Sequence, residues 1–207
     1  MDVSCIVLAG GRASRLGHNK AQVRIGNKTL FQRVLCGISF IKGEVIVVSG
    51  GKESFPILSS ESRERLVTDI YPRKGPLVGI FTGLRVSRSQ HNLVVACDMP
   101  FLNRGLLSYM IELATGFDLV IPRLGDMVEP LHAVYSRDCL AAIERMIEQD
   151  NLGVNRLLSR VRVRYVEADE IDRFDPAHLS FFNINTEADL KAAREIDSCR
   201  DIVSDQC

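Results

Sequence analysis

Short apolar runs rich in β-branched residues alternate with amphipathic segments along this chain, and that alternation constrains the fold most. Each run is too short for a helix and ends at a polar or glycine-containing turn. The strand predicted over Val3–Leu8 leads to Gly10 and Gly11, and the most apolar strand, over residues 92–97, ends at Asp98. Strands separated by helices favour a parallel sheet with helices on both faces.

The remaining elements follow from the same two periodicities. Further strands are predicted over residues 44–48, 65–68, 118–122, 131–135, 161–166 and 181–184. Helices are predicted over residues 29–38, 76–86, 106–113, 138–147 and 154–158, and from a Thr186 cap to Ile196. The sequence therefore predicts an α/β fold of three layers, Rossmann-like, with a mostly parallel sheet. We expect one domain over residues 1–197 and a polar, frayed tail over residues 198–207.

Charge and cysteine content narrow the function classes. Lys+Arg and Asp+Glu both total 26, so the formal net charge is zero. A neutral chain has no general field that attracts nucleic acid or an anionic membrane, so phosphate binding requires a local site. The six cysteines include no CxxC pair, which favours reduced thiols. The N-terminus carries no positive charge and no run reaches membrane-span length, so we expect a cytoplasmic protein.

The first candidate site is the loop that follows the first strand. Leu8 and Ala9 lead into Gly10 and Gly11. Glycines at this place let backbone amides approach phosphate oxygens closely. Arg15 and Lys20 add positive charge in the same loop, although the spacing matches neither a GxxxxGK[ST] phosphate loop nor a GxGxxG dinucleotide turn. A solvated surface turn is the alternative, and the basic residues just past a buried strand favour phosphate binding.

Three polar residues follow other predicted strands: Ser49, Asp69 and Asp98. Parallel sheets bind ligands beyond the carboxyl ends of their strands. A carboxylate beside a phosphate loop is a natural Mg²⁺ ligand, so we assign Asp98 to the metal; a helix cap or turn is the alternative. Asp69 can accept hydrogen bonds from a ribose or base, or it is a turn carboxylate. Gly75 and Pro76 then open a helix whose free N–H groups face the same edge.

Asn183 and Asn185 are the last candidates. Residues two apart on a strand point to the same face, so both side chains are expected to contact one polar ligand. Turn capping is the alternative for this segment, and it is the preferred interpretation of Thr186, with Asp189 in the capping-box position. The histidines show no metal-ligand spacing and are expected to be ordinary.

Together these segments resemble the molybdenum cofactor guanylyltransferases, the MobA family of the nucleotidyltransferase superfamily. The matching motifs are LAGGRASRLGHNK at residues 8–20, Asp69 with GPLVGI at 75–80, ACDMPFL at 96–102, PLHAVY at 130–135 and FFNINTEADL at 181–190. They cover nearly the whole chain in order. LAGG resembles the guanylyl branch, whereas cytidylyl relatives tend to carry LAAG. Two departures, Asn19 in place of Asp and Ala13 in place of Ser, affect the donor loop.

The resemblance implies a nucleotidyltransferase fold and transfer of GMP from GTP to the phosphate of molybdopterin, with pyrophosphate leaving. The loop residues would hold the triphosphate, Asp98 would bind Mg²⁺, and Asp69 would contact the nucleoside. Asn183 and Asn185 would face the pterin. The implied partners are these small molecules and other proteins of molybdenum cofactor biosynthesis, with no nucleic acid and no membrane. A monomer is expected.

Two alternatives remain open. The same fold can use another base or acceptor, as in a CTP-dependent molybdopterin or sugar-phosphate cytidylyltransferase, and a nucleotide-preference assay separates these. The chain can also be a GTP-binding regulatory module without turnover. Asn19 favours that reading, whereas Arg15, Lys20 and Asp98 argue against it. A pyrophosphate-release assay decides between a module and an enzyme.

Overall fold

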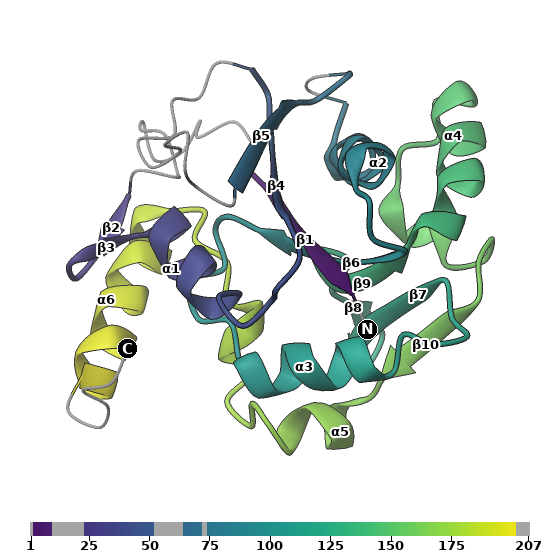
Figure 1. Ribbon diagram of the computed structural model, residues 1–207. Coiled ribbons are helices and arrows are strands. Elements are labelled where there is room, and N and C mark those ends of the chain that lie inside the picture. The colour runs from purple at the N-terminus through teal and green to yellow at the C-terminus, as the bar shows by residue number, and fades with distance from the viewer. Residues whose placement is uncertain (1, 10–22, 52–63, 72–73, 202–207) are drawn as a thin grey trace.

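The computed structural model of the protein describes residues 2–9, 23–51, 64–71 and 74–201. A twisted sheet lies between helical layers, which confirms the predicted α/β class (Figure 1). The strands are β1 Val3–Leu8, β2 Arg24–Ile25, β3 Lys28–Thr29, β4 Val45–Ser49, β5 Glu64–Thr68, β6 His91–Ala96, β7 Leu119–Leu124, β8 Met127–Val128, β9 His132–Ser136 and β10 Val163–Val166. The helices are α1 Leu30–Gly37, α2 Pro76–Val86, α3 Arg104–Glu112, α4 Leu140–Glu148, α5 Ala168–Asp172 and α6 Glu187–Asp201. Short 3₁₀ helices cover Arg137–Cys139, Val154–Leu157 and Leu179–Phe181.

The main sheet has the order β10-β7-β9-β6-β1-β4-β5, with β8 paired to β7. The pairs β6–β1, β1–β4, β4–β5 and β10–β7 are parallel, whereas β9 runs antiparallel to both β6 and β7. Because β9 reverses direction between its two neighbours, β7 and β10 run the same way as β6. All strands of the main path except β9 therefore end at one edge of the sheet.

Two apolar clusters cover the two faces of the sheet. On one face, α1, α3 and α5 contribute buried side chains such as Phe31, Leu106 and Ile171. On the other, α2 and α4 contribute residues such as Ile80 and Ile143. The alternation of buried residues along β1, where Val7 joins one cluster and Ile6 the other, explains why this strand shows no polar period in sequence.

Helix α2 packs directly onto β1, and its glycines make that approach possible. A Cβ at Gly83 would lie 2.5 Å from Cγ2 of Ile6, and one at Gly79 would lie 3.2 Å from Cδ2 of Leu8. Both distances leave no space for an added methyl group without repacking. The short approach fixes the start of α2 relative to the carboxyl end of β1.

A third, smaller apolar cluster lies beside the first two. It combines Ile25 of the β2–β3 hairpin, Leu30 of α1, Phe101, Ile184 and residues of α6. The hairpin and α6 lie together at one side of the molecule in Figure 1, away from α4. This cluster joins segments from both ends of the sequence.

The predicted strand over residues 181–184 is wrong. The chain forms the 3₁₀ helix Leu179–Phe181 and then runs without regular structure to Thr186. Local bonds take up the backbone groups here: the amide of Phe182 donates to the Leu179 carbonyl at 3.0 Å, and the Asp175 carboxylate accepts from Leu179 and Ser180. The amide of Ile184 donates to the Asp98 carbonyl at 3.1 Å, so this segment makes turn and loop contacts in place of a strand ladder.

The other differences concern short elements and one helix end. The hairpin β2–β3, strand β8 and helix α5 are too short to show a period in sequence, and none was predicted. Helix α6 runs to Asp201, beyond the predicted end at Ile196, so the predicted frayed tail at 198 starts inside the helix. In the part of the chain that the structure describes, no helix is both long and apolar enough to cross a membrane.

Candidate active site

The carboxyl ends of β1, β4, β5 and β6 bring most of the described candidate residues to one edge. The amide of Ala9 donates to the Val48 carbonyl at 2.9 Å, and the amide of Cys97 donates to the Leu8 carbonyl at 3.0 Å. Across the next strand boundary, the amide of Asp69 donates to the Ser49 carbonyl at 2.8 Å. The order along this edge is therefore Asp69, Ser49, Leu8 with Ala9, and then the residues after β6.

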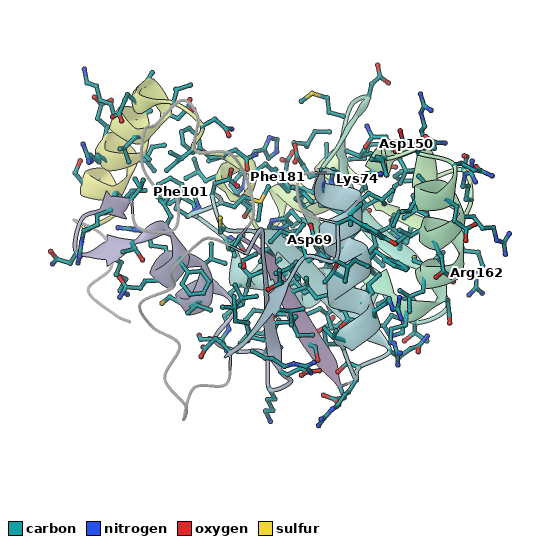
Figure 2. The ribbon with its side chains drawn as sticks, turned by 90° about the horizontal axis from the view of Figure 1, so that it is seen from above. Asp69, Lys74, Phe101, Asp150, Arg162 and Phe181 are labelled. Atoms are coloured by element: carbon teal, nitrogen blue, oxygen red, sulfur yellow. The ribbon has the colours of Figure 1, made fainter. Side chains whose placement is uncertain are left out.

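Asp69 is held in place by α2. Its Oδ1 accepts hydrogen bonds from the Thr82 hydroxyl at 3.1 Å and from the Tyr71 amide at 3.2 Å. Oδ2 lies 4.0 Å from where a Cβ of Gly79 would be. The predicted turn role is thus present, and one carboxylate oxygen is committed to it. The same contacts fix the orientation of the Asp69 side chain at the β5 end of the edge, close to the start of α2 (Figure 2).

Ser49 is nearly inaccessible, with an exposed fraction of 2%. Its hydroxyl accepts from the Gly51 amide at 3.3 Å. The Ser49 carbonyl accepts a hydrogen bond from the Asp69 amide at 2.8 Å. The Ser49 side chain therefore holds the backbone at the end of β4 through Gly51.

Asp98 follows β6 at the centre of the edge and is half-buried. It does not cap α3, because Asn103 does so by accepting from the Leu106 amide at 3.0 Å. The carbonyl of Asp98 accepts from the Ile184 amide at 3.1 Å. This backbone bond brings the segment of Asn183 and Asn185 next to Asp98, although the two lie far apart in sequence.

The two asparagines differ in their surroundings. Asn183 is half-buried, and its Nδ2 donates to the Phe181 carbonyl at 3.1 Å, whereas Asn185 is exposed. The amides of Asn185 and Thr186 both donate to Oδ2 of Asp189, while the Thr186 hydroxyl accepts from the Asp189 amide at 3.2 Å. This confirms the predicted capping box at Thr186. The prediction that a strand aligns the two asparagine side chains is wrong, because this segment is not a strand. The Ile184 bond still places the segment that carries both asparagines next to Asp98.

Gly10, Gly11, Arg15 and Lys20 lie outside the described residues, as do the departures Ala13 and Asn19. The structure describes the residues on both sides of this loop. Ala9 is buried at the end of β1, and Val23 precedes β2.

The start of α2 lies near Asp69 at the same edge of the sheet. Its N-cap residue Gly75 has φ +98° and makes no side-chain cap hydrogen bond, and Pro76 occupies the first turn. The first amides of such a helix are free to bind an anion. Nζ of Lys74 lies 3.4 Å from Oδ1 of Asp150, which ties the loop before α2 to the end of α4 (Figure 2).

The residues of this edge fit a Mg²⁺ ion held by one carboxylate. Among the residues that the structure describes, no group of three His, Cys, Asp or Glu side chains gathers as a metal site. Mg²⁺ in nucleotide enzymes takes one or two carboxylates and completes its shell with phosphate oxygens and water. Asp98, an oxygen donor at the centre of the edge, matches that requirement.

A buried imidazole lies at the same edge of the sheet. His132 begins β9, is fully buried, and its ring meets Phe181 edge-on at 5.1 Å between centroids. Within the described part of the chain, neither ring nitrogen has a hydrogen-bond partner. Burial lowers the pKa of His132 to about 4, although the Asp175 carboxylate acts in the opposite direction. Burial also raises the pKa of the nearby Glu129, whose carbonyl accepts from the His132 amide.

His132 is expected to make stability depend on pH in a defined window. The unfolded chain takes up this proton near the ordinary pKa of 6.5 and the native protein only near 4, so stability falls as pH drops through that interval. The difference is worth about 3 kcal/mol. Denaturant unfolding of His132→Leu should therefore show a weaker loss between these pH values than the wild type. An unchanged slope in His132→Leu would contradict the assignment.

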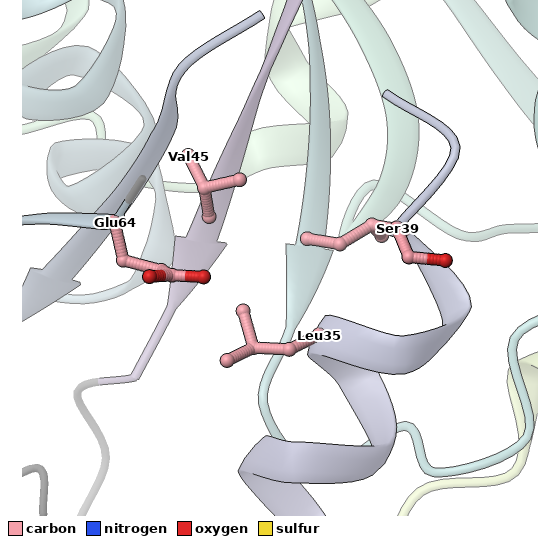
Figure 3. Close-up of a pocket in the computed structure, with 5 residues that line it drawn as sticks. Leu35, Ser39, Val45 and Glu64 are labelled. Atoms are coloured by element: carbon pink, nitrogen blue, oxygen red, sulfur yellow. The ribbon is translucent and has the colours of Figure 1, made fainter. Parts of the chain in front are cut away.

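One hollow lies elsewhere. Leu35, Ile38, Ser39, Val45 and Glu64 line a cavity of about 140 Å³ (Figure 3). Val45 and Glu64 begin β4 and β5, so this hollow is at the amino edge of the sheet, opposite the candidate site. It takes no part in the arrangement described above.

Sequence reasoning missed the residues that hold the site in shape. Thr82 orients Asp69, but a threonine inside an apolar helix carries no signal of that partner. Arg33 and Asp197 form an ion pair across most of the chain length, which spacing alone cannot reveal.

Comparison with known proteins places this geometry in a family. The model for the MobA-like NTP transferase domain matches residues 5–166. The chain is 41% identical to a probable molybdenum cofactor guanylyltransferase of Methanosarcina mazei, covering 91% of this chain and 88% of the relative. It is 37% identical to one of Pelotomaculum thermopropionicum, covering 91% and 90%.

Solved structures agree with this assignment. The crystal structure of molybdopterin-guanine dinucleotide biosynthesis protein A from Archaeoglobus fulgidus superimposes with a TM-score of 0.81 at 32% identity, covering 95% of this chain and 99% of that one. The fold alone is shared with 2-C-methyl-D-erythritol 4-phosphate cytidylyltransferase from Thermus thermophilus, at a TM-score of 0.70 and 18% identity, covering 96% and 100%. The fold is therefore that of the nucleotidyltransferases, and the chain belongs to the MobA-like NTP transferase family.

Proposed function

We propose that this chain is a Mg²⁺-dependent guanylyltransferase that transfers GMP from GTP to the phosphate of molybdopterin. The observation that carries the proposal is the order of groups along one sheet edge. Asp69 stands at one end and the carboxyl end of β1 and Asp98 in the middle, and the Ile184 amide bond brings the segment of Asn183 and Asn185 next to Asp98. The relatives named molybdenum cofactor guanylyltransferase support the same donor and acceptor.

The dimensions of the edge suit two substrates side by side. Asp69 and Asp98 follow β5 and β6, which are three strand spacings apart in the sheet order. At about 4.8 Å for each spacing, the two carboxylates are separated by roughly 14 Å. A nucleoside at Asp69 can thus extend its phosphates over the carboxyl end of β1 towards Asp98. The acceptor phosphate approaches from the side of Asn183 and Asn185.

The reaction is a substitution at the α-phosphorus of GTP. An oxygen of the molybdopterin phosphate forms a bond to that phosphorus, and the bond to the bridging oxygen of the β-phosphate breaks, so pyrophosphate leaves in line. The acceptor is already an anion, so no general base is required. Catalysis consists of positioning the two substrates and compensating negative charge.

Each described residue contributes to positioning. Asp69, fixed by Thr82, accepts hydrogen bonds from the nucleoside. Leu8 and Ala9 precede Gly10 and Gly11, which the sequence assigns to phosphate binding and which lie outside the described residues. Asp98 would hold Mg²⁺, which supplies positive charge to the phosphate oxygens as negative charge develops on the leaving group. The amides at the start of α2 add a further favourable field for anions.

Nucleotide selectivity tests the donor assignment. We expect GTP with Mg²⁺ to raise the melting temperature more than CTP, ATP or UTP at the same concentration, because a ligand that binds only the native state stabilises it. A ligand present at about a hundred times its Kd stabilises by about 2.7 kcal/mol, which is easily measured. Equal shifts for all four nucleotides, or a larger shift for CTP, would contradict a guanylyl donor.

A further inference from the structure

A buried ion pair joins α1 to the C-terminal helix. Nη1 and Nη2 of Arg33 lie 2.6 and 2.5 Å from Oδ1 and Oδ2 of Asp197, so the guanidinium and the carboxylate meet in a two-pronged contact. The side chains are only 16% and 11% exposed. Such a fork-to-fork geometry fixes both distance and orientation, which a lysine in place of the arginine would not do.

The same arginine also holds the β2–β3 hairpin. Its Nε and Nη2 donate to the carbonyl of Ile25 at 3.2 and 2.8 Å. Gly26, at the turn of this hairpin with φ +55°, packs so closely that a Cβ there would lie 3.0 Å from Oδ2 of Asp197. Arg33 therefore ties three elements together: α1, the hairpin and α6.

This tied unit packs against the segment that lies beside Asp98. Ile25 and Leu30 share a buried cluster with Ile184, and Phe101 lies in the same cluster on the side of α6 (Figure 2). Ile184 stands between the two asparagines of the acceptor side, and its amide binds the Asp98 carbonyl.

Stability alone is a poor reason for such a pair. Removing two charges from water is costly, and replacing a buried ion pair by apolar residues of similar volume is often neutral or stabilising. An ion pair that positions neighbouring elements, in contrast, requires specific partners and a specific angle between them. Misplacement of reacting groups by about 1 Å can cost a hundredfold in rate.

We propose that Arg33 and Asp197 are positioning residues for guanylyl transfer: their ion pair sets the β2–β3 hairpin and the Ile184 segment in register with Asp98. The proposal rests on the proposed function, because its main readout is the rate of transfer. Neither side chain is proposed to touch a substrate. Their effect passes through the hairpin and the Ile184 segment, which share one apolar cluster, to Asp98.

The test is the apolar replacement Arg33→Met with Asp197→Leu. We expect this double variant to lose less in melting temperature than the single change Asp197→Asn, because it leaves no charge unpaired and loses only the bonds to the Ile25 carbonyl, while kcat/KM for molybdopterin falls about tenfold or more, with kcat itself reduced. The single change Asp197→Asn should lower both the melting temperature and kcat/KM, because it leaves the arginine charge buried without its partner. Arg33→Lys keeps the positive charge but loses the two-pronged contact, so its kcat should stay below that of the wild type.

A second ion pair, in which the carboxylate is largely buried and the arginine is exposed, serves as the control. Arg162 and Asp118 form a similar contact, with Nη2 2.7 Å from Oδ1, but they lie where β7 begins, at the edge opposite the site. Asp118→Leu with Arg162→Met should leave kcat/KM unchanged at a temperature well below unfolding. If the Arg33 and Asp197 double variant is stable and also keeps wild-type kcat and kcat/KM, the positioning role is refuted.

A second readout separates this proposal from the proposed function. Hydrogen exchange of the Ile184 amide, bound to Asp98, and of the Leu30 amide, bound to Val23, reports the register without any turnover. Both amides should exchange faster in Asp197→Asn than in Asp118→Asn. If the wild type shows no guanylyl transfer but these amides respond as expected, the function fails and the structural tie stands. If they exchange alike in both variants, the tie itself is wrong.

Discussion

Asp98→Asn is expected to lower the rate of guanylyl transfer by at least about a hundredfold, a loss typical of removing one group that stabilises developing charge. The carboxylate stands at the centre of the sheet edge, next to the carboxyl end of β1. An asparagine keeps the shape and the backbone bond to Ile184 but removes the charge that Mg²⁺ requires. Far-ultraviolet circular dichroism and melting temperature should remain near those of the wild type, because Asp98 is only half-buried.

Asp126→Asn is the matched control for that experiment. Asp126 is exposed in the turn between β7 and β8, so the change removes the same charge at the same edge of the sheet without touching the candidate site. Its rate should equal that of the wild type. A folded Asp98→Asn variant with a near-normal rate in saturating Mg²⁺ would show that the metal assignment is wrong.

Asn185→Ala is expected to raise KM for molybdopterin roughly 10- to 100-fold while leaving GTP binding almost unchanged. A lost hydrogen bond to a charged partner is worth about 1.5–3 kcal/mol, which corresponds to that range. The asparagine is exposed, and the Ile184 backbone bond brings its segment next to Asp98. Steady-state kinetics with each substrate varied in turn measures the two KM values.

Thr186→Ala controls for a purely structural effect at the same place. It removes the hydroxyl that accepts from the Asp189 amide and should cost about 1 kcal/mol of stability as a lost helix cap. It should leave the acceptor KM near the wild-type value. If Asn185→Ala instead lowers the melting temperature as Thr186→Ala does and weakens both substrates equally, Asn185 belongs to the cap and not to the acceptor site.

The regular parts of the fold were accessible from sequence because their patterns are long. The strand Val3–Leu8 and the helix Pro76–Val86 are predicted with the bounds that the structure has. A buried parallel strand is a continuous apolar run, and a proline at the first turn marks a helix start clearly. Once these elements are placed, the edge that carries Asp69 and Asp98 follows from the direction of parallel strands.

The rest depends on contacts that no local pattern encodes. Residues 181–184 have the composition of a strand, but the Asp175 carboxylate binds two amides of the preceding turn and sets a 3₁₀ helix instead. In the sequence pattern Arg33 looks like an ordinary surface residue, because it is a charged residue in an amphipathic helix. Its burial results from Asp197, which only the packing of α6 on the hairpin brings near.

The His132 imidazole gives the same lesson for electrostatics. In sequence it stands in a short apolar run and has no metal-ligand spacing, so it was expected to be ordinary. In the structure it is fully buried, and burial is the main cause of its lowered pKa. The degree of burial depends on Phe181, which belongs to the segment whose secondary structure was predicted wrongly.

The most direct test of the central claim is identification of the product. The protein should be incubated with molybdopterin, Mg²⁺ and each of GTP, CTP, ATP and UTP separately, and the pterin products should be resolved by mass spectrometry. We expect molybdopterin guanine dinucleotide with GTP, one pyrophosphate released for each molecule formed, and little product with the other nucleotides. A cytosine dinucleotide product from CTP at an equal or higher rate, or GTP binding without any pyrophosphate release, would contradict the assignment of this chain as a guanylyltransferase.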